Sequence, residues 1–199
     1  MQYTKRIMIL AAVFYAVSLP FGAGVFAETY QIDPGHSTMG FAVKHLMVSI
    51  VRGNFTTYSG AIQFDRANPE SFNAEVSIDA QSINTNVSDR DKHLKSPDFF
   101  DVEKFSTITF KSKKLVPKSD GYDIVGDLTM KGVTKEMTIP VWISGPVKSP
   151  MGADVIGLSG EATINRQDFG VSWNKKMDQG GAVVDDNVKI IVEIEAHKK

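Results

Sequence analysis

The sequence predicts an all-β fold of antiparallel strands, and three observations lead to it. Apolar and polar residues alternate with a period of two through most of the chain after residue 27. Clusters of Gly, Pro, Asp and Ser separate these segments at short intervals. No helix pattern alternates with the strands, and short connections favour antiparallel neighbours. A closed barrel or a sandwich is therefore expected, and a parallel sheet is not.

The first 27 residues have the pattern of a cleaved secretory signal peptide. Lys5 and Arg6 precede an apolar run, residues 7–17, that is short for a membrane span, and Ala27 ends a cleavage-site pattern. Cleavage would leave one domain, residues 28–199, in the periplasm or outside the cell. The whole chain has a formal charge of −1, and the signal removes two basic residues and no acidic one. The remaining domain gives no support for nucleic-acid binding, and none of its segments is apolar enough to span a membrane.

The chain contains no cysteine. This excludes disulfides, thiol catalysis and thiolate metal sites. An exported domain without disulfides must be held together by its own hydrophobic core.

The alternation predicts roughly nine strands, and the clearest of them covers residues 72–80. There Phe72, Ala74 and Val76 form an apolar face, while the residues between them are polar. The other expected strands place one apolar face at Met39, Phe41 and Val43; Ile62 and Phe64; Ile108 and Phe110; Tyr122, Ile124, Leu128 and Met130; Met137, Ile139, Val141 and Ile143; Ile156, Leu158, Ala162 and Ile164; Phe169, Val171 and Trp173; and Val188, Ile190, Val192, Ile194 and Ala196.

A charged segment, residues 82–110, interrupts the strand pattern and predicts one short helix near residues 89–96. Ser88 and Asp91 have the spacing of a capping box, which satisfies free N–H groups at a helix start. Pro97 disfavours helical geometry in the residue before it and so ends the helix. The helix should lie near an opening or lid.

Common catalytic patterns are missing from the sequence. The chain has no Gly-x-Ser-x-Gly nucleophile elbow, no phosphate-binding Gly-rich loop and no close metal-ligand spacing among its histidines. No cofactor and no metal site is therefore expected. A site assembled from the distant His36, His45 and His93 stays a minor alternative.

Four polar residues are candidates for an end of the fold. Arg90 and His93 are either part of a solvated helix or meet an anionic or carbonyl head group at an opening. His45 shares its strand phase with Phe41 and so should end an apolar lining. For Arg52, an ion pair is favoured over a ligand contact.

The order of short motifs resembles the YceI-like polyisoprenoid-binding family. The matching segments are Tyr30-x-Ile-Asp33, His36-Ser37, Phe41-x-Val-Lys-His-Leu46, Arg52-Gly-x-Phe55, Ser82-Ile-x-Thr-Asn86, Arg90-Asp-x-His-Leu-x-Ser96, Asp98-Phe99-Phe100, Phe105-x-Thr-Ile-Thr-Phe110, Gly126-Asp-Leu-Thr129, Lys131-Gly-Val-Thr-Lys135 and Arg166-x-Asp-Phe-Gly170. Together they cover nearly all of the chain after the signal.

The resemblance implies a lipocalin-like antiparallel barrel of about eight core strands, with the short helix near its opening. It also implies a periplasmic or secreted carrier that holds an isoprenoid chain, such as a quinone tail or a polyprenyl phosphate. Transport, storage and stress protection are the expected roles, and the protein is not expected to be an enzyme. A homodimer is compatible with the pattern.

From strand phase and position, we expect nine residues to contact the ligand. Phe41, Val43, Phe110, Phe169 and Trp173 should line the cavity, and His45, Arg52, Arg90 and His93 should lie near one end. Two other functions stay open: an enzyme acting on a bound lipid, which needs a polar cluster inside the cavity, and a stress-protection or interaction protein with a filled core.

Overall fold

The computed structural model describes residues 27–175 and 181–199, so all of the predicted signal peptide except Ala27 lies outside the described residues. The elements in chain order are β1 (Glu28–Ile32), β2 (Thr38–His45), β3 (Ser49–Phe55), β4 (Tyr58–Phe64), η1 (Pro69–Ser71), β5 (Asn73–Asp79), η2 (Ala80–Ser82), β6 (Ile83–Asn84), α1 (Ser88–Lys95), β7 (Thr107–Lys118), β8 (Gly121–Met130), β9 (Val133–Lys148), β10 (Asp154–Asn165), η3 (Arg166–Phe169) and β11 (Val184–Lys198).

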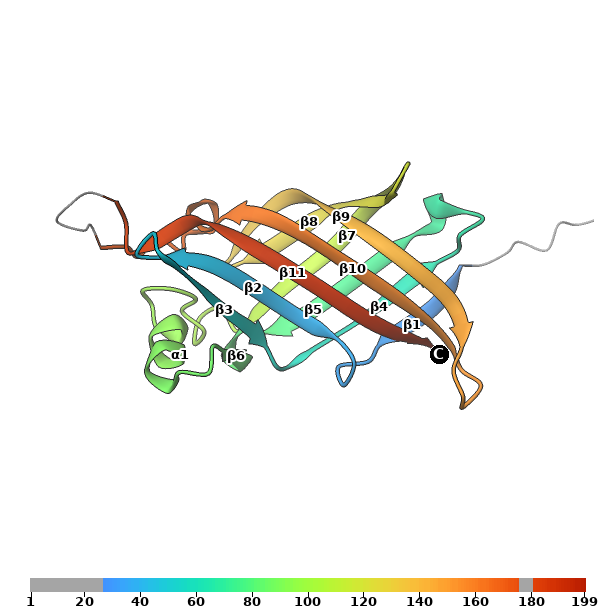
Figure 1. Ribbon diagram of the computed structural model, residues 1–199, viewed down its shortest axis with the longest axis horizontal. Coiled ribbons are helices and arrows are strands. Elements are labelled where there is room, and N and C mark those ends of the chain that lie inside the picture. Colours follow the sequence, from blue (N-terminus) through green and yellow to red (C-terminus); the bar gives the residue numbers. More distant parts are fainter. Residues whose placement is uncertain (1–26, 176–180) are drawn as a thin grey trace, which may run out of the picture.

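Eight strands close an antiparallel barrel in the order β1-β4-β5-β7-β8-β9-β10-β11, with β11 pairing back to β1. The long strand β11 pairs with two different strands, β2 and β1, along the same edge. Its first part pairs with β2 from Val184 to Glu193, and its last part pairs with β1 from Ala196 to Lys198. Strands β2, β3 and β6 therefore extend one end of the barrel, next to α1 (Figure 1). The predicted all-β, lipocalin-like barrel is confirmed.

Eight of the nine predicted strands are present, and the predicted strand at Phe169, Val171 and Trp173 is wrong. Residues 166–169 form the 3₁₀ helix η3 instead, because the Asn165 side chain caps its start and Gly170 ends it at φ 70°. The period-two spacing of these residues is therefore coincidental. The strands missed were β1, β3 and the two-residue β6, whose apolar residues alternate weakly.

The predicted helix is confirmed within one residue, but its cap is different. The residue before α1 is Val87, which has no capping side chain. Asp91 accepts hydrogen bonds from the Thr85 backbone N–H at 2.8 Å and from the Thr85 hydroxyl at 2.5 Å. The carboxylate thus secures the turn that leads into α1. No helix among the described residues is long and apolar enough to cross a membrane.

The buried side chains form two hydrophobic clusters that follow each other along the barrel. One cluster includes Tyr30, Ile62 and Ile156, which are each 1% exposed, and fills the end where β1 closes the sheet. The other includes Phe99 and Phe169 and packs under α1 and the loop that follows it. The space between them forms the candidate site.

Candidate ligand-binding cavity

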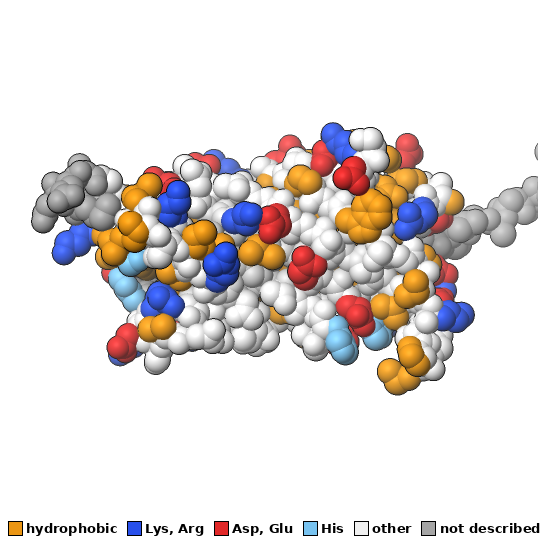
Figure 2. Space-filling view, viewed as in Figure 1, with side chains coloured by type: hydrophobic (Ala, Val, Ile, Leu, Met, Phe, Trp, Pro, Cys, Tyr) orange, Lys and Arg blue, Asp and Glu red, His pale blue; other side chains and the backbone are white. Residues whose placement is uncertain are grey.

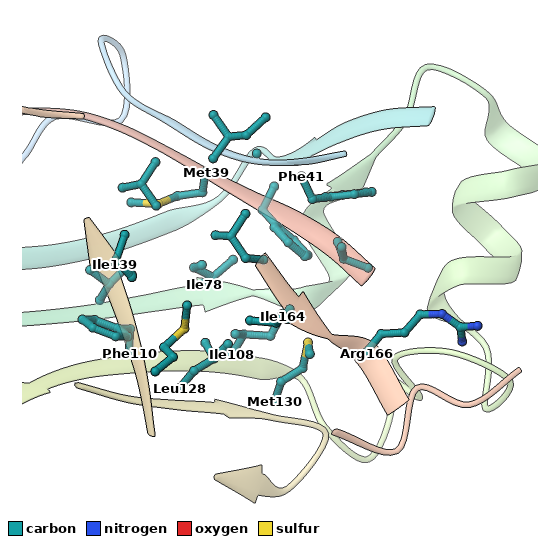
Figure 3. A pocket seen from close by; sticks show the side chains of 18 of the residues that line it. Met39, Phe41, Ile78, Ile108, Phe110, Leu128, Met130, Ile139, Ile164 and Arg166 are labelled. Atoms are coloured by element: carbon teal, nitrogen blue, oxygen red, sulfur yellow. The ribbon is translucent and has the colours of Figure 1, made fainter. Parts of the chain in front are cut away.

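An apolar cavity of about 190 Å³ lies inside the barrel and reaches the α1 end (Figure 3). Strands on all sides contribute to it, because the inward positions of a closed barrel converge on its axis. Apart from Gly40 and Arg166, all of its lining residues have apolar side chains. At the α1 end Leu94, Phe99 and Phe100 complete the wall. The cavity is suited to a hydrocarbon group and not to a polar one.

Two aromatic rings in the cavity wall lie over glycines of neighbouring strands. A Cβ atom on Gly126 would lie 2.5 Å from the Phe110 ring and 2.5 Å from the backbone oxygen of Lys111. A Cβ atom on Gly53 would lie 2.5 Å from the Phe41 ring. The two glycines let the rings lie flat along the wall, and this leaves the centre of the barrel open.

Replacing Gly126 by alanine is expected to destabilise the fold by about 1–3 kcal/mol and to narrow the cavity. The Lys111 carbonyl belongs to the β7–β8 ladder and cannot move away, so the Phe110 ring must turn inward. Urea unfolding measures the first effect. The second is measured by ligand affinity in a Gly126→Ala, Phe110→Leu double variant, which should regain affinity. Equal affinity in all three proteins would contradict this account of the wall.

Arg166 lines the cavity at its α1 end (Figure 3) and is 4% exposed. Its guanidinium has five N–H donors, and the structure uses all of them. The acceptors are the backbone oxygens of Val171 (2.6 Å), Trp173 (2.9 Å), Asp185 (2.9 Å) and Val184 (3.3 Å) and the Asp186 carboxylate (2.8 Å). Burial lowers the pKa of the guanidinium, and the nearby carboxylates oppose this effect.

With every donor occupied, Arg166 fastens the segment after η3 to β11, and only its aliphatic stem faces the cavity. It was not among the predicted site residues. The Arg166-x-Asp-Phe-Gly170 motif was the available sequence signal, but no pattern indicated that the charge is buried and satisfied by backbone oxygens.

The predicted apolar site residues divide into two groups. Phe41, Val43 and Phe110 line the cavity. Phe169, which is 2% exposed, and the half-buried Trp173 are instead part of the hydrophobic cluster at the α1 end. The Trp173 ring contacts Phe99 and His93 at centroid distances of 5.3 and 5.1 Å. Ligand contacts of all five residues stay a prediction.

Arg90 and His93 lie on α1 beside the cavity, but both hold local structure. Arg90 donates from Nε to the Thr85 hydroxyl (2.8 Å) and from Nη2 to the Thr85 backbone oxygen (2.9 Å). His93 Nε2 lies 2.9 Å from the Asp98 carboxylate, and its ring packs edge-on against Phe99. Neither is a lining residue. A head group would meet them only outside the apolar part of the cavity.

His45 and Arg52 lie on the hairpin of β2 and β3. His45 is half-buried at the end of β2, in the predicted phase but beyond the cavity lining, and Arg52 is exposed. The ion pair expected for Arg52 is not found, since no carboxylate in residues 27–175 and 181–199 lies within 4.0 Å of it. Contacts of either residue with a ligand stay a prediction.

A family model described as "YceI-like domain" matches residues 30–196 of the chain. The chain belongs to the YceI-like family. A UPF0312 protein of Staphylococcus aureus is 39% identical over 161 residues, which are 80% of this chain and 92% of that protein. The likeness therefore extends over almost the whole described barrel.

Solved structures share the YceI-like architecture. The Campylobacter jejuni YceI protein is 34% identical, with a TM-score of 0.68 over 78% of this chain and 90% of that one. BcnA of Burkholderia cenocepacia is 24% identical, with a TM-score of 0.74 over 83% and 99%. A polyisoprenoid-binding domain from Saccharophagus degradans is 16% identical, with a TM-score of 0.62 over 85% and 98%. The last two likenesses bear on the fold alone.

Proposed function

We propose that this YceI-like protein binds the hydrocarbon chain of an isoprenoid, such as a quinone tail or a polyprenyl phosphate, inside its barrel. The observation that carries the proposal is the cavity, because among the described residues its only charged side chain is an arginine whose donors are all occupied. The S. degradans domain, described as polyisoprenoid-binding, has the same fold and supports the choice of ligand class.

The physical chemistry favours a hydrocarbon chain. Each buried methylene gains about 0.8 kcal/mol, and ordering of the chain and desolvation of the head group offset part of this gain. Three methionines, Met39, Met130 and Met137, are in the wall. Their flexible side chains can repack around a guest larger than the present cavity. The rest of a long chain, with its head group, would extend past α1.

The cavity supports a protein that binds its ligand without converting it. Among the described residues, the lining contains no serine, histidine, aspartate or glutamate that could act as nucleophile or general base. The presence of a cavity also argues against a filled core. From the cavity and the predicted signal peptide together, we propose that the protein carries or stores isoprenoids in the periplasm or outside the cell and has a role in stress protection.

Tryptophan fluorescence tests the proposal directly. The chain has two tryptophans; Trp142 is exposed on β9, and Trp173 packs at the α1 end of the cavity. A Trp142→Phe variant leaves Trp173 as the reporter. Titration with a short ubiquinone or a polyprenyl phosphate in detergent below its micelle concentration should quench it saturably, with one ligand per chain.

Two further measurements complete the test. Organic extraction of protein purified without detergent, followed by mass spectrometry, should yield isoprenoid lipids. A linear, unsaturable quench together with a lipid-free extract would overturn the proposal. A straight-chain fatty acid, titrated in parallel, measures the preference for a branched chain. If the fatty acid bound with higher affinity than the isoprenoid, the proposed ligand class would change to straight-chain lipids.

A further inference from the structure

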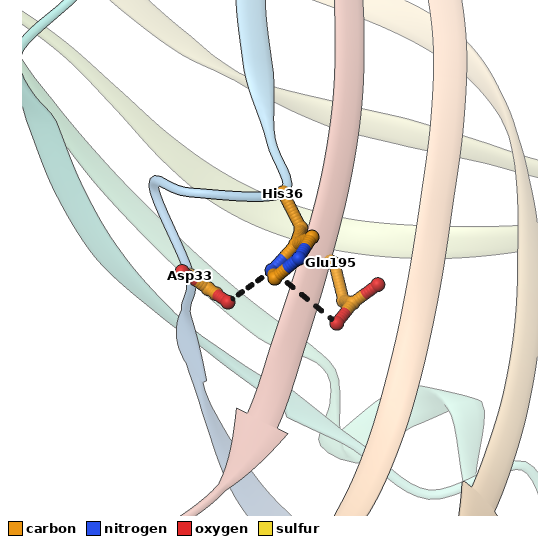
Figure 4. A group of neighbouring side chains, drawn as sticks. All are labelled: Asp33, His36 and Glu195. Carbon is orange, nitrogen blue, oxygen red and sulfur yellow. Dashed lines mark hydrogen bonds and ion pairs between the residues drawn. The ribbon is translucent and has the colours of Figure 1, made fainter. Parts of the chain in front are cut away.

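Four side chains that the cavity does not use converge where β11 changes its partner from β2 to β1. They are Asp33 at the end of β1, His36 in the following turn, and Glu195 and His197 on β11. Figure 4 shows the first three, with both carboxylates directed at the His36 ring. The distances are 2.7 Å from His36 Nδ1 to Asp33 Oδ2 and 3.9 Å from His36 Nδ1 to Glu195 Oε1.

The second histidine completes a ring of four atoms. His197 Nε2 lies 2.9 Å from Glu195 Oε1 and 3.7 Å from Asp33 Oδ2. Nitrogen and oxygen atoms thus alternate around a small centre. Two nitrogens and two oxygens around a four-coordinate ion at about 2.0–2.1 Å would be separated by about 3.3 Å. Four of the six separations in such a site are observed, and they bracket this value. The ligand atoms of Asp33, His36 and Glu195 all lie within 4.8 Å of one another, so His197 is the side chain that would have to turn to complete the site.

The backbone around the cluster is fixed, which would lower the cost of assembling a site. Glu195 and His197 are two residues apart on one strand and so point to the same face, while Ala196 between them is fully buried. The Gly35 N–H donates to Asp33 and holds the turn. Ser37 exchanges hydrogen bonds with the backbone of Glu195, which anchors the turn to β11.

We propose that Asp33, His36, Glu195 and His197 bind a divalent transition-metal ion, with Zn²⁺ or Cu²⁺ as the class that two imidazoles and two carboxylates prefer. The site is open to solvent, since the His36 side chain is 68% exposed. It lies outside the cavity, so it is independent of the proposed lipid ligand. An ion there would cross-link β1, the turn and β11 at the seam that closes the barrel.

Protons compete with the metal in a predictable direction. Asp33 raises the pKa of His36, mainly through their hydrogen bond, and this same bond lowers the pKa of Asp33. A metal binds the neutral imidazole, so protons and the metal ion compete for His36. Because the pKa of His36 is raised, this competition should begin above the ordinary histidine pKa of about 6.5, and affinity should fall further as the pH decreases.

The test is calorimetric titration of the untagged protein with Zn²⁺ near neutral pH, and Ca²⁺ and Mg²⁺ serve as controls that should give no heat. We expect one Zn²⁺ per chain and an affinity at least about tenfold weaker in His36→Ala and in His197→Ala. His45→Ala and His93→Ala remove histidines outside the cluster and should leave it unchanged. With Cu²⁺, electron paramagnetic resonance should show nitrogen hyperfine coupling that weakens in His36→Ala.

Circular dichroism separates misfolding from loss of a ligand. If Zn²⁺ and Cu²⁺ give no binding heat, or if the folded His36→Ala and His197→Ala variants bind them as well as the natural chain, the site does not exist. The four residues would then be a hydrogen-bonded clamp of the barrel seam.

A second, independent observation concerns the tip of the β2–β3 hairpin, residues 44–52. Val48 N–H donates to the His45 backbone oxygen, and both central residues of this turn, Leu46 and Met47, have positive φ (50° and 61°). Such turns favour Asn-Gly, because large side chains are strained there. Apolar side chains are exposed at this turn: Leu46, Met47, Val48 and Ile50 are 40–84% exposed.

The charge around the tip indicates what it meets. Residues 44–52 contain Lys44 and Arg52, both exposed, and no carboxylate. The tip lies at the same end of the molecule as α1 (Figure 1), and in Figure 2 apolar and basic side chains lie at this end, with acidic ones among them. The nearest carboxylates of the paired strand are those of Asp185 and Asp186, and Asp186 is already paired with Arg166. An apolar tip flanked by cations fits a bilayer containing anionic lipids. We infer that the tip docks on such a membrane surface. This inference rests on the proposed function, and docking would place the α1 end of the cavity at the membrane, the source of its ligand.

Replacing the turn separates docking from folding. Leu46→Asn with Met47→Gly installs the preferred turn residues, so the unfolding midpoint should stay equal or rise. Flotation with vesicles of phosphatidylcholine and phosphatidylglycerol should show binding by the natural chain, at least about tenfold weaker binding by this variant, and weaker binding in high salt. Met151→Ser, which removes an apolar side chain 90% exposed outside the tip, should bind as the natural chain does.

Failure of the membrane-docking inference can be distinguished from failure of the lipid-binding proposal. A chain that quenches with isoprenoid in detergent but does not float with vesicles overturns the docking inference alone. Equal flotation of the turn variant and the natural chain also overturns it. Flotation without any isoprenoid binding would support docking of the tip on membranes and contradict the proposed function.

Discussion

Replacing Arg166 by methionine is expected to lower the free energy of unfolding by about 3–5 kcal/mol. Methionine keeps the apolar stem that faces the cavity but removes five hydrogen bonds. Four backbone oxygens, those of Val171, Trp173, Val184 and Asp185, then lose a donor in a largely buried region. Leaving such groups unpaired costs more than a typical hydrogen bond contributes.

Urea denaturation of the two proteins measures this difference. Arg52→Met is the matched control, because that arginine is exposed and its replacement should change stability by less than about 0.5 kcal/mol. Arg166→Lys should recover only part of the loss, since an ammonium group has three donors and cannot reproduce the planar fork. If Arg166→Met were as stable as Arg52→Met, the guanidinium would not hold the segment after η3 to β11.

The alternation of apolar residues was sufficient to predict most of the barrel. It identified β5, β8 and β11, because in a barrel wall one face is buried along the whole strand. It failed where burial does not alternate. Strand β3 has exposed apolar residues at the hairpin tip, and the apparent strand at 169–173 is held by caps and by Arg166.

The site was only partly predictable for a similar reason. Phe41, Val43 and Phe110 follow from strand phase, and they line the cavity. The burial of the Arg166 guanidinium at the α1 end of the cavity depends on backbone oxygens that no side-chain pattern reveals. The proposed metal ligands come from two segments about 160 positions apart, and only the β1–β11 pairing brings them together. Sequence spacing cannot detect such a group.

Val188→Asp is expected to abolish ligand binding, with an affinity at least about a hundredfold weaker. Val188 lines the cavity from β11, between Val43 on β2 and Ile164 on β10. A carboxylate there keeps water in the apolar space, and a hydrocarbon chain would have to displace that water without offering a hydrogen bond in return. The Trp173 fluorescence titration measures the affinity.

Asn187→Asp provides the matched control for this change. It adds the same charge one residue earlier on β11, where the side chain is exposed and faces away from the cavity, so affinity should be unchanged. Val188→Thr retains the shape of the side chain and adds one hydroxyl, so the loss of ligand affinity should be intermediate. This milder variant distinguishes a loss of affinity from a folding defect. Both Asp variants add one negative charge to β11, and only Val188→Asp places it in the cavity wall, so equal affinities would mean that the ligand does not occupy the barrel.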